Sequence, residues 1–468
     1  MFDAVVVGAG PNGLAAAITL ARAGRSVCVL EANERVGGGS RSAELTEPGF
    51  VHDVCSAIHA FGAVTPFFAT SPLREHGLEW VVPEIAVAHP LGGDRAAYAV
   101  RSVRETADVV GSPRYESLMR PIVERWDDLT PQVLGPLVRV PRHPVTLARF
   151  GIPALLPATV LGRALGDERA AALFAGCAAH AIRPLQRPLT SSFGLMLLAS
   201  AHLGGWPVAR GGSQSIADAL ASLLRSLGGE IRCGVMVRSM ADVPPARAVL
   251  FDLAPRQVAA IAGDRLPASW RRRAERFRHG SGACKVDYAL DEPVPWLAEP
   301  CRRAGTVHVG GTLDEIAAAE DEVARGRHAP RPFVLVAQQS VCDPSRAPEG
   351  KATLWAYCHV PNGSDLDVSD TIERQIERFA PGFRDVVRAR HVMTAAQLER
   401  YNPAYVGGDI TGGANDTRQL VFRPFAGRPY RTADPALFLC SASTPPGGGV
   451  HGLCGEHAAR VALRTVLR

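Results

Sequence analysis

The strongest constraint on the fold of this chain lies at its start, where a short apolar run leads into three closely spaced glycines. Residues 2–7 read FDAVVV, a β-branched apolar run that is typical of a parallel strand buried on both faces. A G-x-G-x-x-G pattern follows at 8–13, and residues 14–24 then carry apolar side chains at helical spacing. A second apolar run at 26–32 completes a strand–turn–helix–strand unit. This unit predicts an α/β domain with a parallel sheet.

Each glycine of the pattern has a physical role in binding a dinucleotide. Gly8 permits the tight turn, Gly10 lets the backbone approach a pyrophosphate, and Gly13 lets the helix pack closely on the strand. Pro11 and Asn12 lie in the same turn, and the free N–H groups of the helix N-terminus are expected to hold the phosphates. The sequence therefore predicts a Rossmann-type dinucleotide site at these five residues.

The residues after the second strand indicate which dinucleotide is bound. Glu31 is expected to accept hydrogen bonds from the adenosine ribose, and its charge argues against the extra phosphate of NADP. A second loop with an arginine and three glycines follows, which makes sense if the ligand continues past its pyrophosphate into a ribityl chain and an isoalloxazine ring. The predicted FAD-binding residues of this stretch are Ala32, Arg35, Gly38, Gly39, Ser40 and Arg41.

This E-x-x-x-R-x-G-G pattern resembles the extended fingerprint of the FAD-binding amine oxidase and phytoene desaturase superfamily. The resemblance extends to "GACKVDYALDEPVPW", "YVGGDITGG" and "LFLCSASTPPGGGVHGLCGEHAAR", and so covers nearly the whole chain. The closest resemblance is to the phytoene dehydrogenase-like branch, some members of which are named after pyridine nucleotide-disulfide oxidoreductases. This chain has no C-x-x-C pair, and no separate nicotinamide-binding domain is recognised in it.

The resemblance also assigns residues distant from the first turn to the cofactor. A strand running from Val237 to Met240 is expected to place its backbone against the adenine. A second glycine-rich turn precedes the last helix, whose N–H groups and dipole would favour the anionic reduced flavin. The residues expected along the flavin ring are Ala442, Ser443, Gly449, Val450 and His451.

The same pattern predicts a discontinuous α/β fold, with a Rossmann-type FAD-binding domain and an inserted substrate domain. Residues 1–104, 201–279 and 426–468 are expected to form the FAD-binding domain. A helical part at 105–200 shows apolar spacing of three and four, and a part at 280–425 contains strand-like runs that predict a mixed sheet.

Few side chains stand out as candidates for acid–base chemistry, because the flavin carries most of the reaction. His451 lies inside the second glycine turn, and His59 follows the arginine–glycine loop; both are candidate catalytic residues, against the alternative of a purely structural histidine. Tyr401 and Tyr405 are candidate substrate-lining residues. The surroundings of Cys454 do not resemble a covalent flavin motif, so the FAD is expected to be non-covalent.

Composition narrows the possible partners. The 468 residues are 47% hydrophobic and 21% charged with a net charge of +5, yet the basic residues are nearly all arginine and no basic run with interleaved aromatics occurs. We therefore expect no nucleic-acid partner. The ten cysteines show no metal-ligand spacing, so no metal is expected. Neither a leader peptide nor a spanning run of apolar residues is recognised, which predicts a cytoplasmic protein.

One apolar stretch, residues 145–166, is broken by two prolines. It predicts either a peripheral membrane contact or lid over an apolar substrate, or a helix–turn–helix packed in the core, which is the commoner outcome for such stretches. The oligomeric state and the electron acceptor stay open.

The expected activity is the dehydrogenation or desaturation of a mostly hydrophobic small molecule by hydride transfer to flavin N5, with reoxidation by oxygen, a quinone or another acceptor. Three alternatives share this architecture: an amine or amino-acid-derivative oxidase, a redox-neutral flavin-dependent isomerase, and a non-enzymatic prenyl- or lipid-binding protein. The last would have no physical reason to keep both glycine turns together with Glu31.

Overall fold

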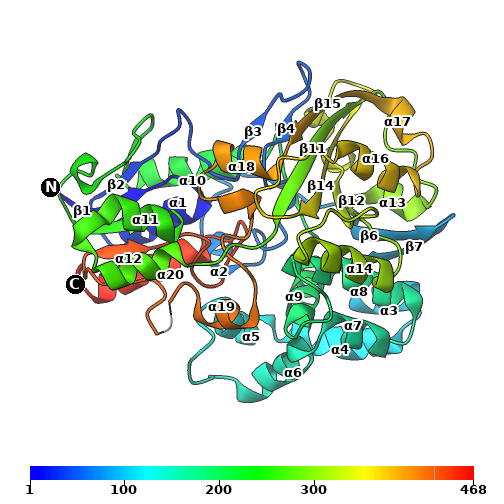
Figure 1. Cartoon of the computed structure of the whole chain (residues 1–468), viewed down its shortest axis with the longest axis horizontal. Coiled ribbons are helices and arrows are strands. Elements are labelled where there is room, and N and C mark those ends of the chain that lie inside the picture. Colours follow the sequence, from blue (N-terminus) through cyan, green and yellow to red (C-terminus); the bar gives the residue numbers. More distant parts are fainter. Residues whose placement is uncertain (426) are drawn as a thin grey trace.

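A five-stranded parallel sheet forms one end of the molecule in the computed structural model, which describes residues 1–425 and 427–468 (Figure 1). Its strands come from three separate stretches of the chain, which confirms the predicted discontinuous α/β fold. Their spatial order is β16 (Leu437–Leu439), β10 (Ala246–Phe251), β1 (Phe2–Val7), β2 (Val27–Leu30) and β9 (Glu230–Arg232).

Helices cover both faces of this sheet. Ala4 and Val6 of β1 pack against helices on one face, and Val5 and Val7 pack against helices on the other, so residues 4–7 of the strand are all apolar. The first face is covered by α1 (Pro11–Arg22), α10 (Gln214–Ser226) and α20 (Leu453–Arg464), and the second by α11 (Pro255–Ala262) and α12 (Ala268–Glu275).

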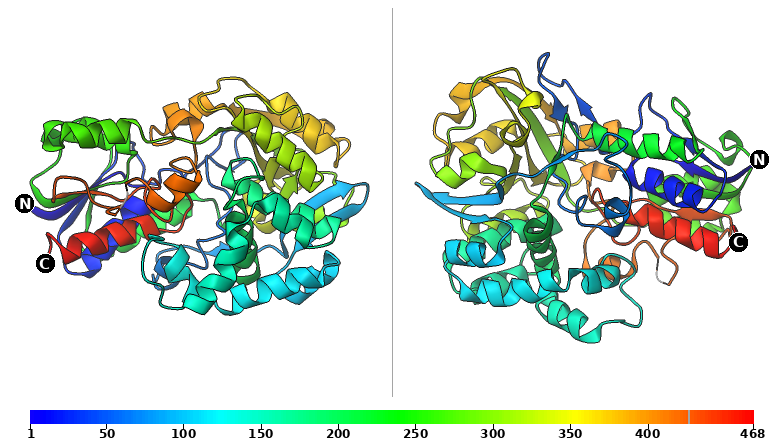
Figure 2. Two further views of the ribbon diagram at one scale, coloured as in Figure 1. Left: turned by 60° about the horizontal axis from the view of Figure 1, so that its bottom comes forward. Right: turned by 180° about the vertical axis from the view of Figure 1, so that it is seen from behind.

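A second sheet of seven strands, mostly antiparallel, forms the other end of the molecule (Figure 2). The order is β15 (Val387–Met393), β11 (Gly282–Leu290), β14 (Ala352–Val360), β13 (Val334–Ala337), β12 (Ala304–Val309), β6 (Ile85–Gly92) and β7 (Arg95–Ala99).

Both faces of the second sheet are also covered. One face packs on a helical layer, in which Ser102, Ser112 and Asp167 cap helices by accepting hydrogen bonds from backbone N–H groups. This layer contains α3 (Val103–Val109), α4 (Pro113–Glu124), α5 (Trp126–Val133), α6 (Pro144–Leu155), α7 (Ala158–Ala164), α8 (Glu168–Ala178) and α9 (Thr190–Gly204). The opposite face packs on α13 (Glu299–Arg303) and α16 (Ser369–Glu377).

Short elements complete the chain. They are β3 (Ser42–Ala43), β4 (His52–Asp53), α2 (Pro66–Ala69), β5 (Trp80–Val81), β8 (Val208–Ala209), α14 (Leu313–Ala324), α15 (Gln339–Cys342), α17 (Phe383–Val386), α18 (Ala395–Tyr401) and α19 (Thr417–Phe422).

Two expectations differ from this structure, and a third is not tested by it. Strands β6 and β7, which fall inside the segment 1–104 expected for the FAD-binding domain, belong to the second sheet because β6 pairs in parallel with β12. No strand runs from Val237 to Met240; β9 ends at Arg232 and a 3₁₀ turn begins at Met240. The expected domain boundary at 426 falls on the one residue outside the described part of the chain.

The apolar stretch 145–166 is a helix–turn–helix that packs on one side only. It forms α6 and α7, and the side chains of Val145, Ile152 and Leu155 are 66%, 69% and 60% exposed. α6 lies at the lower edge of the molecule in Figure 1, away from both sheets. The segment is therefore partly packed and partly exposed, and the membrane contact or lid stays a prediction.

Candidate active site

One cavity of about 780 Å³ connects the two halves of the molecule. Its wall includes Gly8 and Gly10 from the first glycine turn and Gly448 and Gly449 from the second. The two turns begin helices α1 and α20, which lie side by side in Figure 1 as the first blue helix and the red helix. Two segments from opposite ends of the chain therefore border one cavity.

Close packing makes glycine necessary in the first turn. A β-carbon on Gly13 would collide with the carbonyl oxygen of Gly8, and one on Gly10 would lie 2.6 Å from Oδ2 of Asp252. The N–H of Gly13 donates to that same oxygen at 2.9 Å. The turn therefore has the tight approach of helix to strand that the G-x-G-x-x-G pattern predicts.

Glu31 braces this turn from the end of β2. Its Oε2 accepts a hydrogen bond from the N–H of Ala9 at 2.8 Å, and its Oε1 accepts one from the N–H of Asn33 at 3.0 Å. Arg41 also donates to Oε1 at 3.2 Å. The carboxylate is buried, yet it lines the cavity and keeps lone pairs that can receive ribose hydroxyls.

Most of the other predicted cofactor residues also border the cavity, with two exceptions. Gly13 lies behind the turn and acts through packing, whereas Arg35 lies outside, with its side chain 65% exposed and 3.7 Å from Asp218. The residues on the wall are Pro11, Asn12, Ala32, Gly38, Gly39, Ser40, Arg41, Val237, Ala442, Ser443, Val450 and His451.

Three of these residues contain polar atoms that are buried and lack a partner among the described residues: Oδ1 of Asn12, Oγ of Ser40 and Nε of Arg41. Buried polar atoms are rarely left unpaired in a folded protein. A polar ligand along this wall would satisfy them, and the wall therefore fits a dinucleotide.

His451 has both ring nitrogens engaged by the backbone. Nδ1 accepts the N–H of Leu453 at 3.1 Å, and Nε2 therefore carries the proton and donates to the carbonyl of Gly447 at 3.1 Å. Burial lowers the pKa of His451 to about 4, so the ring is neutral near pH 7. This geometry orders the second glycine turn and leaves no free nitrogen to accept a substrate proton.

His59 is engaged in a similar way. Ser213 donates its hydroxyl to the carbonyl of Ser56 at 2.5 Å, so Nε2 of His59 donates to the Ser213 hydroxyl at 3.0 Å. Nδ1 lies 3.3 Å from the Ser56 hydroxyl, and burial lowers the pKa of His59 to about 4. His59 borders the cavity, but as a neutral ring held by two serines.

Tyr401 and Tyr405 lie on the cofactor side of the cavity. The Tyr401 hydroxyl is 3.5 Å from Nη1 of Arg41, whose guanidinium lies 5.8 Å from the centre of the Tyr401 ring. Tyr405 is packed so closely on Gly39 that a β-carbon there would collide with its hydroxyl. Both tyrosines border the cavity, beside residues predicted to bind the cofactor.

The second sheet forms a wall that the sequence reasoning missed. Lys285, Tyr357 and Leu335 occupy one row across strands β11, β14 and β13, and Trp355 lies in the next row with its ring 5.1 Å from that of Tyr357. Lys285 is buried and forms an ion pair with Asp287. The alternation of Trp355 and Tyr357 in "LWAYCHV" was the available signal, since strand residues two apart share a face.

The helical end of the cavity is mostly apolar, although Gln132, His180 and Ser192 also border it. Helices α6 and α9 contribute Phe150, Ala154, Phe193, Met196 and Leu197. Among the described residues that line the cavity, the carboxyl groups are those of Glu31 and Asp252, and both lie at the first glycine turn. The helical end of the cavity thus offers an apolar surface without a carboxylate.

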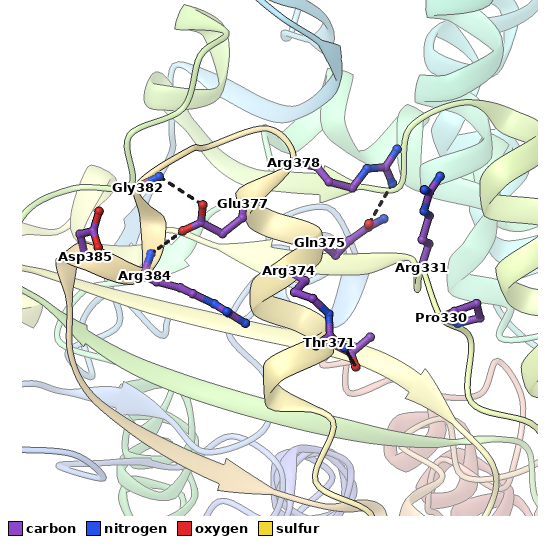
Figure 3. Close-up of a pocket in the computed structure, with 10 residues that line it drawn as sticks. All are labelled: Pro330, Arg331, Thr371, Arg374, Gln375, Glu377, Arg378, Gly382, Arg384 and Asp385. Atoms are coloured by element: carbon purple, nitrogen blue, oxygen red, sulfur yellow. Dashed lines mark hydrogen bonds between the residues drawn. The ribbon is translucent and has the colours of Figure 1, made fainter.

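A separate surface groove of about 590 Å³ lies over α16 and α17 (Figure 3). Its arginines are already paired: Arg374 and Arg384 with Asp370, and Arg378 with Glu315 at 2.8 Å. These ion pairs are substantially exposed, and the groove offers no reactive group.

Neither a metal centre nor a single membrane-spanning helix is present in the described part of the chain. Within residues 1–425 and 427–468, no group of three or more histidine, cysteine, aspartate or glutamate side chains is arranged to hold a metal. No single helix in that part of the chain is long and apolar enough to cross a bilayer; α6 and α7 together reach the required length and composition but are bent by 104°.

Comparisons with known proteins agree with this picture. The NAD(P)-binding Rossmann-like domain family matches residues 6–69. The chain is 27% identical to the mouse "Pyridine nucleotide-disulfide oxidoreductase domain-containing protein 2" (Mus musculus), covering 99% of this chain and 93% of that protein. It is 27% identical to the phytoene dehydrogenase of Streptomyces griseus, covering 87% of this chain and 80% of that protein.

A solved structure shows the same fold. The cyclohexylamine oxidase of Brevibacterium oxydans superposes with a TM-score of 0.60 at 14% identity, covering 99% of both chains. The glycine turn, the two-sheet architecture and these relatives agree. The chain is therefore an oxidoreductase that is similar in sequence to phytoene dehydrogenase, has a Rossmann-type dinucleotide-binding domain and shares its fold with an amine oxidase.

Proposed function

We propose that this protein binds FAD non-covalently and removes hydride from a mostly apolar small molecule. The observation that carries the proposal is the single cavity, which runs from the first glycine turn past the second to the apolar surface of α6 and α9. FAD is the dinucleotide whose length and redox end suit a site bordered by two helix N-termini.

Different residues of the cavity wall would bind different parts of the cofactor. Gly10 and Asn12 would hold the diphosphate, Glu31 the adenosine ribose, and the backbone at Gly449 and Val450 the isoalloxazine. Cys454 is directed away from this wall, with its thiol donating to the carbonyls of Thr444 and Gly447 at 3.4 Å, which supports non-covalent binding.

When bound, the flavin supplies the hydride acceptor. The protein's part is orientation and the exclusion of water, since His59 and His451 are neutral and already hydrogen-bonded. A reaction that needs no strong protein base fits this site, which is expected of dehydrogenation at an activated C–H or C–N bond.

The lining favours an uncharged substrate. A cationic amine would find no carboxylate at the helical end of the cavity and would meet Lys285 on the sheet wall. Trp355 and Tyr357 are the specific observation in favour of the second candidate, an amine or amino-acid-derivative oxidase, because an aromatic pair can hold an amine by packing and, when the amine is protonated, by cation–π attraction.

Anaerobic mixing separates these candidates. Purified protein is titrated with a polyene hydrocarbon, a long-chain alcohol, a primary diamine and an N-methylated amino acid, and bleaching of the flavin absorbance is followed. We expect an apolar compound to bleach the flavin. Bleaching by amines alone would favour the second candidate, and conversion without net bleaching, on prereduced flavin, would indicate an isomerase. A colourless folded protein that cannot be reconstituted would revive the non-enzymatic scaffold.

The apolar substrate would enter from an anionic lipid surface. Residues 129–166 contain four arginines and no acidic residue. Arg163 is paired with Asp314 at 2.6 Å, so the positive charge of this surface comes from Arg139, Arg142 and Arg149. Exposed apolar side chains, including Val140 at 89% and Ile152 at 69%, lie in the same segment. Phe150 and Ala154 of α6 border the cavity, so the basic apolar surface is continuous with the substrate site.

Vesicle sedimentation tests this surface. The protein should sediment with phosphatidylglycerol vesicles, less with phosphatidylcholine vesicles, and less at high salt. The double variant Ile152→Asp, Leu155→Asp should lose the binding, whereas Leu366→Asp, at another residue that is 51% exposed, should keep it. If the double variant binds the phosphatidylglycerol vesicles as well as the wild type does, the proposed lipid-binding role of this surface would be refuted.

A further inference from the structure

An acidic side chain lies inside the turn that is predicted to hold the diphosphate. Asp252 directly follows β10 and borders the cavity. Its Oδ2 accepts the N–H of Gly13 at 2.9 Å and lies where a β-carbon on Gly10 would reach to within 2.6 Å. The carboxyl group is therefore held against the first turn by the backbone of α1.

This contact reduces what the helix N-terminus can offer to an anion. Of the first three helical residues, Pro11 has no N–H and the N–H of Gly13 is taken by Asp252, so Asn12 supplies the remaining N–H. A diphosphate bound there would meet a carboxyl group and few compensating donors. An ionised carboxylate at that place would repel the ligand.

The surroundings of Asp252 favour the neutral acid. The charged or titratable groups that face it are Glu31 from the end of β2, Tyr405, Cys440 after β16 and Cys454 on α20. Burial raises the pKa of the tyrosine and of both cysteines, so these three are neutral. Arg41 is paired with Glu31 at 3.2 Å. Among the described residues, no cationic side chain forms an ion pair with Asp252 itself.

The titration of Asp252 agrees with this arrangement. Burial, with a smaller contribution from the charge of Glu31, raises its pKa to about 7. A bound diphosphate adds negative charge beside the carboxyl group and would raise that pKa further. The proton is therefore retained at a pH where an ordinary aspartate is ionised.

We infer that Asp252 binds the dinucleotide as a carboxylic acid: Oδ2 continues to accept the Gly13 N–H, while the hydroxyl at Oδ1 donates to the diphosphate. This inference rests on the proposed function, because it needs FAD in the cavity. One proton passes from solvent to Asp252 for each FAD bound by the ionised apoprotein. Asp252 is thus a positioning residue for the cofactor.

The linkage gives a measurable consequence. Below the pKa of Asp252 in the apoprotein, FAD affinity is independent of this group. Above it, each unit of pH should weaken the affinity by about tenfold, because binding must recover one proton. The nearby His59 and His451 do not contribute, since both have a pKa of about 4 and stay neutral over this range.

Titration of apoprotein with FAD between about pH 6 and about pH 9 tests the inference. Flavin fluorescence reports the dissociation constant for the wild-type protein and for Asp252→Asn, which keeps the shape and a donor but cannot titrate. The wild type should weaken with rising pH, and the variant should bind with a nearly constant affinity that matches the wild type at low pH. If Asp252→Asn instead binds FAD more weakly by the same factor at every pH, Asp252 would act as an ionised carboxylate that accepts a hydroxyl group of FAD. That result would overturn the inference.

Proton uptake by the wild-type protein gives a second readout that needs no variant. Calorimetric titration of FAD at about pH 8, in two buffers with different ionisation enthalpies, should show close to one proton taken up per FAD. Tight binding with no uptake and no pH dependence would refute the role of Asp252. No binding at any pH, with folded protein, would instead refute the proposed function.

Discussion

The two glycine turns place a titratable side chain on a helix N-terminus in two different ways. At α1 the carboxyl group of Asp252 accepts the N–H of Gly13, whereas at α20 the imidazole of His451 accepts the N–H of Leu453. The pKa of the carboxyl group is raised to about 7, and that of the imidazole is lowered to about 4. Near neutral pH the first turn can change its charge and the second cannot.

This difference separates two tasks. A turn that holds a diphosphate can be coupled to a proton, but a turn beside a redox ring benefits from constant charge, because a titrating neighbour would move the reduction potential. The turns nevertheless act on one cavity, since Gly455 of α20 packs on α1 so closely that a β-carbon would collide with the carbonyl oxygen of Asn12. Each turn, and the contact between α1 and α20, can be tested separately.

The largest expected effect is at the first turn. Gly10→Arg should abolish FAD retention, because the side chain would collide with Asp252 and fill the path of the diphosphate. Flavin content per folded chain is the measurement. Leu366→Arg, at a surface position, should retain the flavin. Undiminished flavin in the Gly10 variant would count against the site.

The next largest effect is expected where Gly455 of α20 packs against α1. Gly455→Ala is expected to lower the free energy of unfolding by about 1–3 kcal/mol, because the methyl group meets backbone atoms that must shift. Gly151→Ala is the matched control, since that helical glycine has open space around its β-carbon position and alanine favours helix. If urea unfolding gives both variants the same free energy of unfolding, the close packing of α20 on α1 would be refuted.

At the second turn, His451→Ala should cost about 1–2 kcal/mol of stability, because the N–H of Leu453 loses its buried acceptor. Flavin reduction by substrate, measured by stopped flow, should fall less than about tenfold once the variant is saturated with FAD. A loss of about 100-fold or more with unchanged stability would show instead that His451 acts as a general base.

The smallest expected effect concerns the apoprotein and the sign of its pH dependence. The folded-state pKa of Asp252 lies above its ordinary value of 3.8, so the associated stability is complete below about pH 4 and is lost as the pH rises to about 7. The effect is expected to be small because Asp252 is only partly buried and borders the cavity, so solvent can screen its charge. Melting temperatures of apo Asp252→Asn should lack this decline; an identical pH profile would contradict the raised pKa.

The sequence was sufficient for features that depend on local pattern. The run FDAVVV and the glycines at 8–13 predicted a strand buried on both faces and a close helix, because the period of the apolar residues and the absence of side chains are local facts. The second turn was expected at the same ligand as the first, and both border one cavity.

Features that depend on distant partners were missed. The segment that forms β6 was placed in the FAD-binding domain because its parallel partner β12 lies more than two hundred residues along the chain and gives no local signal. Asp252 and Lys285 have no local signal, since their roles come from burial and from neighbours supplied by other strands. His451 was expected near the flavin from its position, but its hydrogen bonds to the turn could only be seen in three dimensions.

The central claim is that both glycine turns hold one FAD, and its most direct test is the absorbance spectrum of the purified protein followed by release and identification of the chromophore. We expect a yellow protein that bleaches on chemical reduction and releases FAD at one molecule per chain without covalent linkage. A folded protein that contains no flavin and takes up none when FAD is added, or one that holds FMN instead, would contradict it.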